Sequence, residues 1–194
     1  MENNLIIAAE ENWVHKNKIL VILAHPDDPE FFCGASIARW CSMGHEVEYV
    51  LLTRGDKGGD ENSNPYDLME TRMLEQKAAA LKLGVKQVTF LEYPDGYLVP
   101  NLEIRKAVVS EIRRSAPDVI VGCDPQNIFY GPGGINHPDH RAAGQIVVDA
   151  LFPAAGNFHY FPELLEQGLP PVSVKELWLS VPSKIGRASC RERV

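Results

Sequence analysis

The sequence predicts an α/β fold with a mostly parallel sheet between two layers of helices. Apolar runs of strand length alternate along the chain with longer segments of helical period, the pattern of a parallel sheet covered on both faces. The 194 residues contain no internal repeat and no low-complexity run, and their number fits one domain. We therefore expect a single Rossmann-like three-layer sandwich.

Each element of this sandwich is indicated by a local pattern. The runs expected to form strands cover residues 19–23, 47–53, 88–91, 119–122 and 174–181, and the expected helices cover 34–43, 66–83, 102–115 and 140–151. Gly44 and Gly84 follow the first two helices, where glycine commonly ends a helix. Asn101 is placed to cap the third helix. Residues 152–171 are rich in Pro, Gly and aromatic residues, which predicts a long loop with a short helix.

Composition excludes several classes of partner. The net charge of −7 argues against binding to nucleic acid or to an anionic membrane. No apolar stretch reaches the ~18 residues that span a bilayer, and the N-terminus lacks the basic start of a signal peptide. Of the four cysteines, Cys33, Cys41 and Cys123 remain once Cys190 in the last ten residues is set aside; they form no CxxC pair and are odd in number, which favours reduced thiols. We therefore expect a cytoplasmic protein without a membrane span.

Polar side chains follow each predicted strand at the point where it ends. His25, Asp27 and Asp28 follow the first strand, and His137 and His140 follow the fourth. Arg54 and Asp56 follow the second strand, and Asp95 follows the third. The carboxyl ends of parallel strands share one edge of the sheet, so these side chains should meet there. Imidazole and carboxylate groups together are typical of a zinc site with an open coordination position.

Two motifs in this set also carry a family resemblance. His-Pro-Asp-Asp at 25–28, within AHPDDPEFFCG at 24–34, is followed over a hundred residues later by His-Pro-Asp-His at 137–140. Together they resemble the PIG-L / LmbE-like family of zinc-dependent N-deacetylases. Further similar segments lie at 53–56, 72–75 and 91–96, so the resemblance runs from about residue 18 to about residue 181.

The resemblance implies a metal site and an acid–base pair. His25, Asp28 and His140 would hold Zn²⁺, although Fe²⁺ or Co²⁺ suit the same donors. Asp27 would be the general base that takes a proton from water. His137 would be protonated, stabilise the oxyanion and protonate the leaving amine. Asp139 would hydrogen-bond to His137 and keep it cationic.

The resemblance further implies a substrate, an N-acetylglucosamine-containing conjugate that loses its acetyl group. Arg72 and Asp95, with Arg54 as a weaker candidate, would hold sugar hydroxyls, and Glu30 would be a partner of a metal-bound histidine. Family members often assemble, so a homo-oligomer is also implied. No Ser or Cys sits in a G-x-S-x-G context, which favours direct attack by water.

Simpler interpretations stay open for several of these residues. Asp27 or Asp28 could cap the following helix, Arg72 could pair with Glu75 or Gln76, and Asp95 lies in a Pro-Asp-Gly turn. At the level of function, the alternatives are a zinc hydrolase of a different amide and a metal-binding but inactive fragment.

The last ten residues, 185–194, require separate treatment. They have no apolar period and resemble the translation of a sequencing-adapter read-through; the alternative is a native basic tail. We expect a domain over 1–184 that is incomplete at its C-terminus, because similar family members usually carry a further strand and helix.

Overall fold

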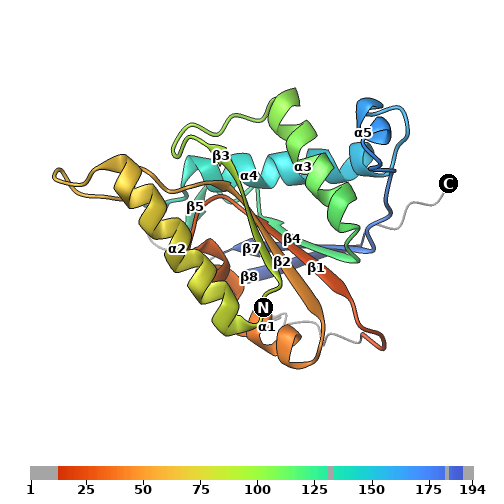
Figure 1. Cartoon of the computed structure of the whole chain (residues 1–194), viewed down its shortest axis with the longest axis horizontal. Coiled ribbons are helices and arrows are strands. Elements are labelled where there is room, and N and C mark those ends of the chain that lie inside the picture. Colours follow the sequence, from red (N-terminus) through yellow and green to blue (C-terminus); the bar gives the residue numbers. More distant parts are fainter. Residues whose placement is uncertain (1–12, 131–132, 182–183, 190–194) are drawn as a thin grey trace, which may run out of the picture.

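The computed structural model describes residues 13–130, 133–181 and 184–189, and its centre is a six-stranded sheet (Figure 1). The strands lie in the order β3-β2-β1-β4-β7-β8. Neighbouring strands are parallel except for the antiparallel pair β7–β8. Their bounds are β1 (Lys18–Leu23), β2 (Glu46–Thr53), β3 (Gln87–Tyr93), β4 (Val119–Cys123), β7 (Glu176–Val181) and β8 (Lys184–Ser189).

Helices cover both faces of this sheet (Figure 1). Two helices, α1 and α2, pack on one face, and α3, α4 and a π-helical segment, η1, pack on the other. Their bounds are α1 (Asp28–Ser42), α2 (Pro65–Leu83), α3 (Leu102–Ser115), α4 (Pro138–Asp149) and η1 (Ala150–Ala155), and a short helix follows as α5 (Glu163–Glu166). The predicted three-layer α/β sandwich with a mostly parallel sheet is confirmed. Among the described residues, no helix has the length and apolar character needed to cross a bilayer.

Strand β1 explains why the sandwich has two cores. Leu20 and Ile22 belong to the core under α3 and α4, whereas Ile19 and Val21 belong to the core under α1. All four side chains are fully buried. A parallel strand covered on both faces needs an apolar side chain at every position, which is why the sequence shows a continuous run and no alternation.

Two helices begin more than one residue earlier than the sequence indicated. Helix α1 starts at Asp28 and not at Gly34, because an extra first turn precedes a non-helical residue, Cys33 (φ −147°, ψ 21°). Helix α4 starts at Pro138 and not at His140, and proline is well suited to the first turn of a helix. Both extra turns carry residues of the two motifs.

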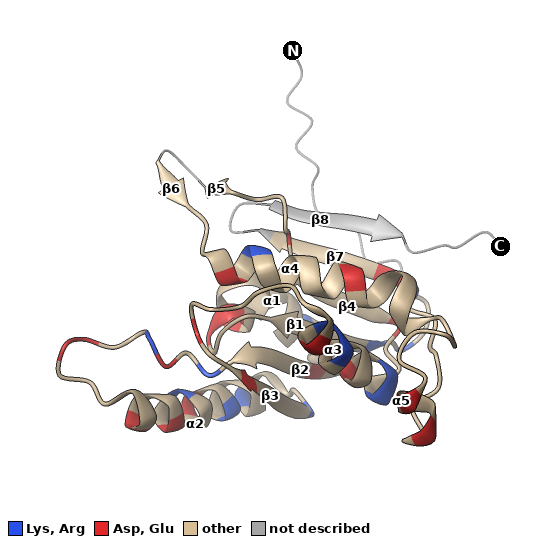
Figure 2. Cartoon of the chain, turned by 90° about the horizontal axis from the view of Figure 1, so that it is seen from above, with Lys and Arg blue, Asp and Glu red and all other residues tan. Residues whose placement is uncertain are grey.

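A small antiparallel hairpin was not predicted. Its strands, β5 (Phe129–Tyr130) and β6 (Gly134–Ile135), have two residues each, too few to show a period. The hairpin stands out from the body of the molecule, and the chain runs from β6 directly into α4 (Figure 2).

Strand β8 falls almost wholly within the segment that the sequence analysis set aside. It pairs with β7 from Lys184 to Ser189, and residues 190–194 lie outside the described residues. The non-native origin of residues 185–194 stays a prediction.

Candidate metal centre and active site

The candidate site lies where the strand order reverses. The chain leaves β1 to build β2 and β3 on one side and then returns to β4 on the other side of β1. Ligands of open parallel sheets bind at such a switch point, beyond the carboxyl ends of the strands. His25 follows β1, and His140 lies in the first turns of α4, which packs against β4. The first motif and the second therefore meet across this crevice.

Three side chains from the two motifs form a triangle of donor atoms. His25 Nδ1 lies 3.2 Å from His140 Nε2, and His140 Nε2 lies 3.1 Å from Asp28 Oδ1. His25 Nδ1 lies 3.5 Å from Asp28 Oδ2. Ligand atoms about 2.0–2.1 Å from a tetrahedral zinc ion are about 3.3 Å apart, so the geometry of these residues fits zinc. The residues form one of two groups of donors with suitable spacing among the described residues; the other is His25, His137 and Asp139.

In each of the two histidines, the ring nitrogen that is not part of the donor triangle has its own partner. His25 Nε2 lies 3.1 Å from Asp95 Oδ1 and 3.3 Å from Asp139 Oδ2. His140 Nδ1 lies 3.1 Å from Asn136 Oδ1. Such partners fix the orientation of metal-binding imidazoles. The second donor group would have to use the nitrogen of His25 that already faces these carboxylates, which favours the first group as the metal site.

The charges and hydrogen bonds around His25 and Asp28 favour the binding of a cation. Burial works against a charged His25, but hydrogen bonds to Asp139, Asp28 and Asp95 outweigh it and raise the pKa of the ring to about 11. Burial also opposes ionisation of Asp28, yet hydrogen bonds with the His140 and His25 rings hold its pKa well below the usual range. In the metal-free protein a proton therefore occupies His25, and a metal ion would displace it.

Asp27 has a backbone conformation that is rare for residues other than glycine. Its φ is +90°, in the left-handed region, and its carboxylate makes no capping hydrogen bond to α1. Asp28 accepts hydrogen bonds from the N–H groups of Ala24 and His25, which precede the helix. Helix capping by Asp27 is thus excluded by the structure. The carboxylate of Asp27 is half-exposed, and burial raises its pKa although Arg72 opposes the shift.

The prediction that the Asp139 carboxylate hydrogen-bonds to His137 is wrong. The buried carboxylate of Asp139 accepts hydrogen bonds from the N–H groups of Gly96 (2.7 Å) and Leu98 (3.2 Å) and contacts His25. The exposed His137 ring instead accepts a hydrogen bond at Nδ1 from the backbone N–H of Asp139. Burial and the positive charge of His25 lower the pKa of His137, so Asp139 does not keep this ring cationic here.

Glu30 also lies elsewhere than expected. Its carboxylate accepts hydrogen bonds from Gln76 Nε2 (3.0 and 3.2 Å) and from the Tyr49 hydroxyl (3.4 Å), not from a metal-bound histidine. The ring partner that the sequence analysis missed is Asn136. It lies in the segment just before α4, four residues before His140, and its Oδ1 contacts His140 Nδ1.

The three predicted sugar-binding residues have different surroundings. Arg72 donates to Asp27 Oδ2 (2.9 Å), to the carbonyl of Pro26 (2.8 Å) and to that of Gly55 (3.1 Å). Asp95 contacts His25, as described above, and lies at the metal group. Arg54 forms an ion pair with Glu92 on β3. Substrate binding by each of the three stays a prediction.

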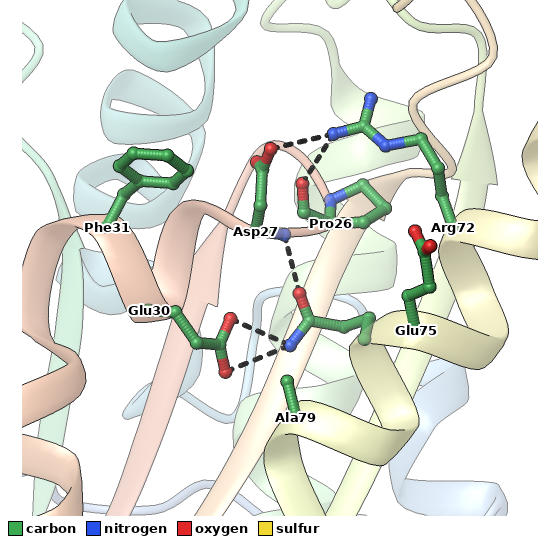
Figure 3. A pocket seen from close by; sticks show the side chains of 8 residues that line it. Pro26, Asp27, Glu30, Phe31, Arg72, Glu75 and Ala79 are labelled. Carbon is green, nitrogen blue, oxygen red and sulfur yellow. Dashed lines mark hydrogen bonds and ion pairs between the residues drawn. The ribbon is translucent and has the colours of Figure 1, made fainter.

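A cavity of about 270 Å³ opens beside Asp27, between α1 and α2 (Figure 3). Its lining combines charged and apolar groups, namely Pro26, Asp27, Glu30, Phe31, Arg72, Glu75, Gln76 and Ala79. The Phe31 ring is 82% exposed, so an apolar surface faces solvent at the rim of the candidate site.

The fold and the site together define an α/β protein with a candidate metal centre at the switch point of a parallel sheet. Residues 20–151, more than half of the chain, match the family described as PIG-L, GlcNAc-PI de-N-acetylase. The chain belongs to the PIG-L family.

Individual relatives extend this finding. The chain is 35% identical over 160 residues to diacetylchitobiose deacetylase of Thermococcus kodakarensis, a match that covers 81% of this chain and 57% of the relative. It is 29% identical over 183 residues to the 1D-myo-inositol 2-acetamido-2-deoxy-alpha-D-glucopyranoside deacetylase of Kineococcus radiotolerans, covering 78% and 49%. The structure of N,N'-diacetylchitobiose deacetylase from Pyrococcus horikoshii with its inhibitor MPG superposes with a TM-score of 0.78, at 31% identity, covering 86% and 61%. The matched region is thus about half to three fifths of each relative.

Proposed function

We propose that this chain is the metal-binding part of an N-deacetylase that removes the acetyl group from an N-acetylglucosamine-containing conjugate. The observation that carries the proposal is the donor triangle of His25, Asp28 and His140, next in sequence to Asp27, whose carboxylate caps no helix and lines the cavity. The relatives support the substrate class, because the three described above are deacetylases of diacetylchitobiose or of an inositol-linked acetamido sugar.

Zinc is the proposed cofactor, and Fe²⁺ or Co²⁺ suit the same donors. When bound, such an ion polarises a carbonyl group and lowers the pKa of water toward ~7. Asp27 is proposed to take the proton of the attacking water. Its carboxylate does not cap α1, and a hydrogen bond of 2.9 Å from Arg72 fixes its position.

His137 is proposed to protonate the leaving amine. Its ring centroid lies 4.7 Å from that of His25 and 5.4 Å from that of His140, so it is close enough to act on a group bound at the triangle. Because Nδ1 accepts the hydrogen bond from Asp139 N, the proton of a neutral His137 resides on Nε2. Arg72 and Asp95 remain proposed contacts of the sugar, and assembly into a homo-oligomer remains a prediction.

The experiment is acetate release from a panel of N-acetylglucosaminides with added zinc. The wild-type chain should release acetate in a chelator-sensitive way, and Asp27→Ala should lower the rate by ~100-fold or more while zinc stays bound. Asp67→Ala, which removes an exposed carboxylate on α2, is the matched control and should retain the rate.

Each alternative has its own outcome in the same experiment. Zinc bound in a 1:1 ratio without acetate release from any sugar would indicate the inactive fragment. Hydrolysis of other acylated amines but not of the sugar panel would indicate a zinc hydrolase of a different amide. Release that Asp27→Ala leaves unchanged would refute the role of Asp27.

A further inference from the structure

The buried amide side chain of Gln76 links the backbone of Asp27 to the Glu30 side chain through hydrogen bonds. Gln76 lies on α2 and is 3% exposed, whereas most of the neighbouring side chains on that helix are exposed. Its Oε1 accepts a hydrogen bond of 2.6 Å from the backbone N–H of Asp27, 49 residues earlier in the chain. Its Nε2 donates to both carboxylate oxygens of Glu30.

We propose that Gln76 is a positioning residue that holds Asp27 in its left-handed conformation and thereby aims the carboxylate of the base. The inference rests on the proposed role of Asp27. Gln76 itself contacts the backbone of the base and not its carboxylate, so it acts through Asp27 and not on the substrate.

The two partners of Gln76 leave its amide only one useful orientation. A backbone N–H can only donate, so it requires the carbonyl oxygen of the amide, and the carboxylate of Glu30 can only accept, so it requires the NH₂ group. The Tyr49 hydroxyl, on β2, donates to Glu30 and ties this chain of hydrogen bonds to the sheet. A glutamate at position 76 would place a second carboxylate against Glu30, and an apolar residue would offer the Asp27 N–H no acceptor.

This arrangement matters because the conformation of Asp27 needs support. A residue with a Cβ at φ +90° is held there only when its surroundings fix it. Arg72 fixes the carboxylate, and its guanidinium also contacts the carbonyl of Pro26. Gln76, one turn further along α2, fixes the amide of the same residue. Without it this peptide group is held by Arg72 alone, through the Pro26 carbonyl, and a displacement of ~1 Å at a catalytic group costs roughly 100-fold in rate.

The test is a kinetic comparison of Gln76→Leu with the wild type, in the zinc-loaded full chain. We expect kcat for acetate release to fall by about 10- to 100-fold, with KM within about threefold and zinc content unchanged. Gln145→Leu, the same substitution at an exposed position of α4, should change neither constant. An activity-independent readout is hydrogen exchange at the Asp27 amide, which should be slow in the wild type and at least tenfold faster in Gln76→Leu.

A second variant covers the case in which Gln76→Leu fails to fold, because that change leaves the Glu30 carboxylate without its amide partner. Gln76→Leu combined with Glu30→Met and Tyr49→Phe removes the three polar groups of this chain of hydrogen bonds together, a change that is much easier to accommodate. It should fold, bind zinc and show the same loss in kcat. Unchanged kcat or unchanged exchange at Asp27 in a folded variant would refute the inference, as would a rate loss that merely follows loss of zinc. A wild-type chain that binds zinc but releases no acetate would instead refute the proposed function, with which this inference falls.

Discussion

Replacing Gly144 with alanine tests whether the close approach of α4 to the end of β4 sets the metal geometry. A Cβ at position 144 would lie 2.4 Å from the carbonyl oxygen of Cys123 and 2.8 Å from the backbone nitrogen of Pro125. Ordinary contact begins at 3.4 Å, so the helix has to move away by roughly 1 Å. His140 lies one turn earlier on the same helix and moves with it.

Such a shift is large for a metal ligand, whose distances are normally kept within about 0.2 Å. We expect zinc affinity to fall by about 10- to 100-fold, or about 1.4 to 2.8 kcal/mol. The unfolding free energy of the metal-free protein should fall by about 1–3 kcal/mol, as for other overpacked sites. The assays are competition titration against a chromogenic zinc chelator and urea unfolding.

Gly34→Ala is the matched control, because the same change there meets its nearest atom, the Cβ of Glu30, at 3.8 Å. This variant should keep the zinc affinity and gain about 0.5–1 kcal/mol from replacing glycine within a helix. Wild-type zinc affinity in Gly144→Ala would show that α4 adjusts without moving His140, and the reasoning would be refuted.

Four further predictions follow from the contacts of the site and the core. Asn136→Ala should weaken zinc binding by about 10- to 100-fold in the same titration, because His140 loses the partner of its Nδ1. Zinc binding at pH 8 should release close to one proton in calorimetry across buffers of different ionisation enthalpy, because the pKa of His25 is about 11 in the metal-free protein. For the same reason the stability that His25 contributes without metal is complete below pH 6.5 and disappears as the pH rises toward 11, so urea midpoints should fall over that range. Arg113→Met should lower the unfolding free energy by about 3 kcal/mol or more, because the buried guanidinium donates to five backbone carbonyls between residues 154 and 169; a loss below about 1 kcal/mol would contradict this reasoning.

The sheet could be predicted because its chemistry is local. The run at 19–23 is buried on both faces, and only continuous apolar sequence satisfies that condition. The donor set could be proposed because the strand ends of a parallel sheet share an edge, and the structure brings His25, Asp28 and His140 within 3.5 Å of one another. These inferences need the order of elements along the chain but no detail of side-chain packing.

The hydrogen-bond partners within the site could not be predicted in the same way. Asp139 is two residues from His137, yet its carboxylate turns toward the loop after β3 and meets the N–H groups of Gly96 and Leu98. Gln76 lies among exposed neighbours on α2, and its burial results from contact with a loop 49 residues away. Neither arrangement leaves a periodic pattern in the sequence, because each depends on how two distant segments pack.

The separation of the donors along the chain has a kinetic consequence. His25 and His140 are 115 residues apart, and they meet only once β1 and β4 are paired. Closing so large a loop is slow, so a metal ion bound by these residues would find its complete donor set late in folding. A ligand that binds only the native state adds to its stability, and here that gain falls on the unfolding rate and not on the folding rate. We therefore expect a bound metal to stabilise this protein after the chain has folded. Metal supply should then affect the unfolding rate more than the folding rate.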